Sequence, residues 1–81
     1  MVCVGLELFK NKKGDDVCML YYTEPIKTRD NLIDFCGNRC GSFYLGFIPS
    51  VEVGDEFSIV YGKAFTWQGK LIQPIDNVIK L

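Results

Sequence analysis

Histidine is absent from the 81 residues, and tryptophan occurs only once, as Trp67. Without histidine the chain lacks the usual general base, the Ser-His and Cys-His nucleophile pairs, and the histidine ligands of many zinc sites. Carboxylate pairs remain at Asp15 with Asp16 and at Asp55 with Glu56, but both lie in predicted turns, where acidic side chains usually face water. We therefore expect a protein that is not an enzyme.

Long apolar runs are also missing, since no segment approaches the roughly 20 residues that a membrane-spanning helix needs. The first eight residues carry neither the basic stretch nor the small-residue cleavage site of a secretory signal. We therefore expect a cytoplasmic protein without a membrane partner.

The four cysteines are Cys3, Cys18, Cys36 and Cys40, and in a reducing compartment they are expected to stay thiols. A zinc site of all four is disfavoured, because structural zinc sites generally use two tight cysteine pairs and only Cys36 and Cys40 are close in sequence. A disulfide between those two remains an alternative in oxidising conditions. We expect no metal and no other cofactor.

A global basic field is lacking as well, because nine basic residues face ten acidic ones. Such a field usually drives binding to nucleic acids and anionic membranes. The balance is locally different from Tyr61 to Leu81, where Lys63, Lys70 and Lys80 are opposed only by Asp76. No phosphate-binding glycine motif occurs, so nucleotide binding is not expected.

What the chain does contain is apolar and aromatic residues, at 48% and 14% of the total. This composition is typical of a folded protein, and 81 residues are enough for one domain only, which we place at residues 1–81. Because a core of this size contributes little net stability, we also expect a homodimer.

Alternating residues predict a strand at the start of the chain, with one face formed by Val2, Val4, Leu6 and Leu8. A polar turn then leads to a second strand over Val17 to Thr23, which Pro25 ends. Thr28 is a suitable N-cap for a short helix from Arg29 to Cys36, with Gly37 after its end.

Further strands are expected over Ser42 to Ile48, over Glu56 to Tyr61 and near the C-terminus, with a hairpin between the last two. The predicted order is β-β-α-β-β-β. The fold class is mainly β (α+β), a small antiparallel and strongly curled five-stranded sheet or partly open barrel with one short helix.

The segment from Tyr61 to Lys70 alternates like a hairpin yet carries more aromatic rings and lysines than a small core needs. Exposed rings stack on bases and lysines neutralise phosphates, which requires neither histidine nor metal. The candidate nucleic-acid-binding residues are Tyr61, Lys63, Phe65, Trp67, Lys70, Tyr21, Lys12 and Lys13. Phe57, in contrast, is expected in the core.

Two functions stay open on these residues. One is single-stranded DNA binding, as expected of a protein of a small phage or plasmid replicon. The other is a protein interaction module or assembly subunit that buries the same rings against a partner. In size and β-rich composition the chain is similar to the small single-stranded DNA-binding proteins of filamentous phages, a resemblance from which no residue is assigned. The predicted helix follows the second strand, whereas in an oligonucleotide-binding barrel it follows the third.

Overall fold

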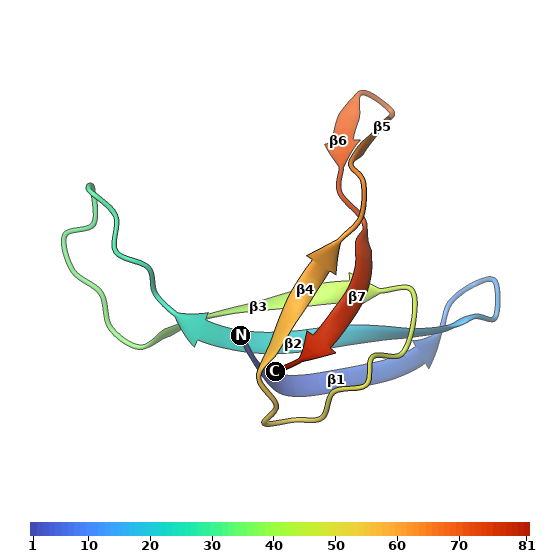
Figure 1. The fold of residues 1–81 in the computed structure, drawn as a ribbon, viewed down its shortest axis with the longest axis horizontal. Coiled ribbons are helices and arrows are strands. Elements are labelled where there is room, and N and C mark those ends of the chain that lie inside the picture. Colours follow the sequence, from blue (N-terminus) through green and yellow to red (C-terminus); the bar gives the residue numbers. More distant parts are fainter.

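The computed structural model describes all 81 residues and consists of seven β-strands without a helix (Figure 1). The strands are β1 (Val2–Lys10), β2 (Asp16–Pro25), β3 (Asn38–Leu45), β4 (Phe57–Tyr61), β5 (Phe65–Trp67), β6 (Lys70–Ile72) and β7 (Ile75–Lys80). They form three antiparallel sheets, a three-stranded one in the order β1-β2-β3 and two-stranded ones made of β4 with β7 and of β5 with β6. No sheet closes on itself.

The hairpin between β1 and β2 is set by a short polar turn. The side-chain oxygen of Asn11 accepts hydrogen bonds from the backbone N–H groups of Lys13 and Asp15, at 2.9 and 3.0 Å. Gly14 has a φ of +86°, a value that favours glycine because it has no Cβ. Asparagine and glycine therefore stabilise the reversal locally, and the two strands pair from there.

The hydrophobic core lies between the three-stranded sheet and the β4–β7 pair. Alternation along β2 turns Cys18, Leu20 and Tyr22 inward, and on the neighbouring strand Leu45 is buried beside them. The buried core residues are Cys3, Cys18, Leu20, Tyr22, Leu45, Val51, Phe57 and Val78. Because these residues come from both sheets, the two sheets share one core.

Backbone hydrogen bonds also join the two layers at the start of β1. The amide of Cys3 donates to the carbonyl of Asp55 at 2.9 Å, the amide of Gly54 donates to the carbonyl of Cys3 at 2.8 Å, and the amide of Phe57 donates to the carbonyl of Met1 at 2.9 Å. This pairing connects residues more than 50 positions apart and fixes β4 against the end of β1.

The predicted helix over Arg29–Cys36 is wrong. The segment between β2 and β3 is an extended loop, with one local backbone hydrogen bond from Leu32 to Arg29 at 3.0 Å. Two helical turns are too short to be stable without tertiary packing. No such packing exists here, since Ile33 is fully exposed and Phe35 is half exposed.

The mainly β, antiparallel prediction is confirmed, but the strongly curled five-stranded sheet or barrel is not found. The predicted faces of the first strand are also wrong in part. The register of β1 against β2 shifts between Cys3 and Gly5, so that Cys3 is buried while Val4 is exposed. Strict alternation cannot anticipate such a bulge.

None of the chain's segments forms a helix with the length and hydrophobicity that crossing a membrane requires.

Candidate nucleic-acid interface

The C-terminal part of the chain forms a projecting hairpin, which we call the arm and define as residues 61–73. It contains β5 and β6 and extends beyond the β4–β7 pair, away from the three-stranded sheet (Figure 1). A two-residue turn at Gln68 and Gly69 reverses the chain, with φ values of 51° and 75°. Positive φ at both central residues is characteristic of the type I′ turns of tight β-hairpins.

One face of the arm gathers aromatic rings. Phe65 and Trp67 are two residues apart on β5 and therefore point to the same side. Their side chains are 48% and 58% exposed, and no core residue covers them. Directly opposite on β6 lie Ile72 and Lys70, which complete this face.

Residues 61–73 include Lys63 and Lys70 and no acidic residue, while the Asp76 carboxylate of β7 lies against Gly62 at the base of the arm. Neither lysine takes part in an ion pair, since the ion pairs in the chain join Lys10 to Asp16 and Lys80 to Asp55. Both ammonium groups are therefore free to bind an anion, and Lys70 lies beside the rings, directly opposite Trp67.

A neck without ladder pairing separates β5 and β6 from β4 and β7. The register shifts between Val60 and Tyr61, and Pro74 has no N–H to donate. The Gly62 amide donates to the Pro74 carbonyl at 2.8 Å, which holds the two sides together. Tyr61, the last residue of β4, is half exposed and lies before this neck, whereas Phe65 and Trp67 lie beyond it on β5.

The structure does not bring the other predicted residues to the arm. Lys12 and Lys13 lie in the turn between β1 and β2, at one end of the three-stranded sheet and remote from the arm in Figure 1. Tyr21 alternates with the buried Leu20 and Tyr22, so it lies on the sheet face turned away from the β4–β7 layer.

The environment of Tyr21 differs from that of the arm. Its phenol donates a hydrogen bond to the Glu7 carboxylate on β1, and its ring packs against Gly5. The hydrogen bond to Glu7, followed by burial and by the charge of Glu7, raises the pKa of Tyr21 above its ordinary value near 10. A carboxylate beside the ring would repel a phosphate, which separates this residue chemically from the arm.

Some exposed apolar residues were not among the predicted site residues. Leu71 is 78% exposed on the other face of the arm, opposite Thr66. Phe9 and Tyr44 lie on the outer face of the three-stranded sheet, with ring centroids 6.4 Å apart across β2. Leu71 could have been identified from the sequence, because strand alternation places it on the opposite face from Lys70 and Ile72.

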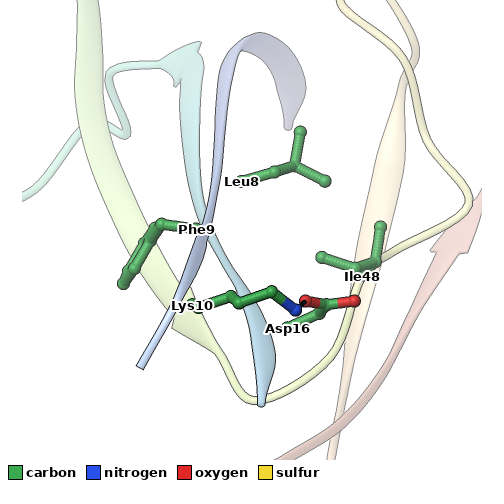
Figure 2. A pocket seen from close by; sticks show the side chains of 5 residues that line it. All are labelled: Leu8, Phe9, Lys10, Asp16 and Ile48. Atoms are coloured by element: carbon green, nitrogen blue, oxygen red, sulfur yellow. Dashed lines mark hydrogen bonds and ion pairs between the residues drawn. The ribbon is translucent and has the colours of Figure 1, made fainter. Parts of the chain in front are cut away.

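A shallow pocket of about 320 Å³ opens beside the end of β1 (Figure 2). Leu8 and Ile48 form its apolar wall, while Phe9 points to the other side of the strand. Its polar groups are Lys10 and Asp16, whose Nζ and Oδ1 atoms are 2.7 Å apart. Because these charges neutralise each other, the pocket offers little to recognise a charged ligand.

The cysteines are all free and lie in different surroundings. Cys3 and Cys18 are buried in the core, whereas Cys36 and Cys40 are exposed. Burial raises the pKa of the Cys18 thiol, and the nearby Cys3 raises it further. No group of three or more potential ligand residues is placed to hold a metal ion.

Comparisons with models of protein families, with curated proteins and with solved structures find no match to this chain.

Proposed function

We propose that the protein binds single-stranded DNA through the arm, with the bases stacking on Phe65 and Trp67 and the phosphates contacting Lys63 and Lys70. The observation that carries the proposal is the pair of exposed rings on one face of a projecting hairpin, with a free lysine directly across from Trp67. Base stacking on exposed rings contributes about 1–3 kcal/mol per base, and lysines beside it add a sequence-independent attraction.

The spacing of the rings favours a single strand over a duplex. Residues two apart on a strand are about 6.8 Å apart along it, which is twice the rise of about 3.4 Å per base in one strand of a duplex. Bases that stack on Phe65 and Trp67 must therefore separate from each other. A single strand does this readily, whereas a duplex would have to lose its stacking first.

The charge distribution supports the same ligand. The whole chain has a net charge of −1, so nonspecific attraction to DNA over its entire surface is weak. The arm is the exception, since it has two unpaired lysines and the nearest carboxylate, that of Asp76, lies at its base beside Gly62. A polyanion is therefore directed to the surface that presents the rings.

Fluorescence titration tests this function, because Trp67 is the only tryptophan. An oligothymidylate added at low salt is expected to quench Trp67 emission as a base stacks on the indole. If two lysines contact phosphates, a plot of the logarithm of the binding constant against the logarithm of the salt concentration should have a slope of about −1.4. Lys70→Ala should change this slope to about −0.7, because one contact is lost. Lys27→Ala, which removes an exposed lysine from the loop between β2 and β3, is the matched control and should keep the slope of the unaltered protein.

Fluorescence anisotropy of a labelled oligothymidylate gives the affinity of variants that lack Trp67. Trp67→Ala is expected to weaken binding about tenfold or more, which corresponds to one lost stacking contact. Absence of binding at low salt would refute the proposal. The double variant Lys12→Ala/Lys13→Ala tests the predicted extension to the β1–β2 turn and should bind like the unaltered protein if the arm acts alone.

A second candidate function, recognition of a protein, is favoured by one observation. Leu71 is the most exposed residue of the arm's apolar set and lies on the face opposite the rings, where stacked bases would not reach it. An arm that is apolar on both faces fits a groove in a partner protein. Leu71→Ser distinguishes the two functions, because it should leave oligothymidylate binding within about twofold of the unaltered value and weaken binding to a protein.

A further inference from the structure

Strand β3 has one unpaired edge. It pairs with β2 along one side and has no strand on the other. Its eight residues pair with β2 in continuous register, without a bulge, and they include no proline and no lysine. Arg39 is the only charged residue on it. The devices that proteins use to protect edge strands from pairing are therefore missing here, apart from that one charge.

The surface area of the chain is large enough to accommodate a further interface. A compact monomer of 9.2 kDa is expected to expose about 4,900 Å², whereas this chain exposes 6312 Å². Only nine residues are buried. The excess exceeds the roughly 800 Å² per partner that a standard stable interface covers.

We propose that a second copy of this chain pairs with the β3 edge, so that two three-stranded sheets join into one six-stranded antiparallel sheet. An antiparallel joint between two identical edges is self-complementary, since a twofold axis brings the same strand to both sides. Each copy then satisfies the free N–H and C=O groups of the other. The inference does not depend on DNA binding, because the arm lies outside the joint.

The register of the joint is limited by the faces of the strand. Residues directly opposite each other in an antiparallel pair lie on the same face of the sheet, and so do a residue and its symmetry copy. The twofold axis must therefore run midway between the two copies of one residue, which pair with each other. Overlap along Asn38–Leu45 is greatest when that residue is Gly41 or Ser42. In the first case Cys40 lies opposite Ser42 of the second copy, and in the second case the two Ser42 residues face each other.

The mass of the protein without nucleic acid is the first test. Sedimentation equilibrium at about 100 μM chain is expected to give about twice the 9.2 kDa of one chain. Ser42→Lys adds like charges near the axis from an exposed position and should weaken dimerisation about tenfold or more. Ser50→Lys makes the same substitution at an exposed loop position and should leave the dimer unchanged.

Cysteine cross-linking then locates the joint. With Cys36 and Cys40 replaced by serine, Ser42→Cys should give a covalent dimer under mild oxidation if the axis passes through Ser42. If the axis lies at Gly41, Ser42→Cys should give a covalent dimer only when Cys40 is retained and Cys36 alone is replaced, because the introduced thiol then bonds to Cys40 of the second copy. The control Ser50→Cys should give no covalent dimer in either background. A mass of 9.2 kDa at about 100 μM, or a Ser42→Lys variant that dimerises normally while its near-UV circular dichroism is native, would overturn the proposal. Since no DNA is present, neither result bears on the function of the arm.

Discussion

The phenol of Tyr21 on β2 donates a hydrogen bond to the carboxylate of Glu7 on β1. The bond stabilises the protonated phenol, and together with burial and the charge of Glu7 it raises the pKa of Tyr21 above 10. Since the pKa is higher in the folded than in the unfolded chain, this contribution to stability is complete below about pH 10. It is lost as the pH rises through the folded-state pKa.

Glu7→Gln should therefore lower the pKa of Tyr21 toward its ordinary value. The acceptor then carries no charge, so the phenolate is no longer repelled. Spectrophotometric titration of tyrosinate absorbance, with Tyr21→Phe used to assign the transition, measures the change. An identical Tyr21 titration in the Glu7→Gln protein would contradict this account.

Gly41→Ala should destabilise the fold by about 1–3 kcal/mol. A Cβ at this position would fall 2.6 Å from Cζ of Tyr22, which is buried and stacked on Phe43 at a centroid distance of 4.9 Å. The ring cannot move without disturbing the core. Gly46→Ala is the control, because no atom lies within 4 Å of the added Cβ. Urea denaturation measures both changes, and equal stability of the two variants would be inconsistent with the packing of Tyr22.

Gln68→Asn should stabilise the arm by about 0.5–1 kcal/mol, since asparagine adopts positive φ more readily than glutamine. Gly69→Ala should have the opposite effect, because φ at Gly69 is 75°. Hydrogen exchange at the amides of Trp67 and Lys70, the pair that flanks the turn, follows the arm without depending on the core. Slower exchange in the first variant and faster exchange in the second are expected, and any other order would argue against the observed turn.

Phe57→Ala and Trp67→Ala should separate the core from the arm. Phe57 is buried, so its truncation is expected to cost about 3–5 kcal/mol. Trp67 is exposed, and its truncation should change the free energy of unfolding by no more than about 0.5 kcal/mol. Chemical denaturation followed by circular dichroism tests this pair. A comparable loss in both variants would mean that the indole belongs to a packed core.

Thiol reactivity should divide the four cysteines into two pairs. Cys36 and Cys40 are exposed and should react with a disulfide reagent in the folded protein. Cys3 and Cys18 are buried and should react only after denaturation, the more so because the pKa of Cys18 is raised and thiolate is the reactive form. Stopped-flow absorbance against a denatured reference counts the two classes. Four rapidly reacting thiols would contradict the observed burial.

Sequence alone predicted the parts of the fold that depend on local alternation. Phe43 and Leu45 point toward the core and Tyr44 points away, as the pattern along that strand indicates. The burial of Phe57 agrees with the same reasoning. These features depend on the two-residue period of a strand, which is visible in any short segment.

The remaining features depend on contacts between distant residues. The segment around Ile33 has the apolar spacing of a helix, but its apolar side chains stay exposed and gain no tertiary packing that would stabilise a helix. The distance between Lys12 and the arm follows from how the two layers cross, which no local pattern records (Figure 1). The bulge beside Val4 likewise reflects the pairing of β1 with two different neighbours.

That double pairing of β1 also bears on how the protein reaches its native state. Cys3 is hydrogen-bonded to both Gly54 and Asp55, so the two layers meet only when a loop of about 50 residues has closed. Such non-local contacts place β-rich domains among the slower two-state folders, with time constants from milliseconds to seconds. The β1–β2 and β5–β6 hairpins close over short turns and can form within microseconds. We therefore expect the docking of β4 onto the first residues of β1 to limit the folding rate.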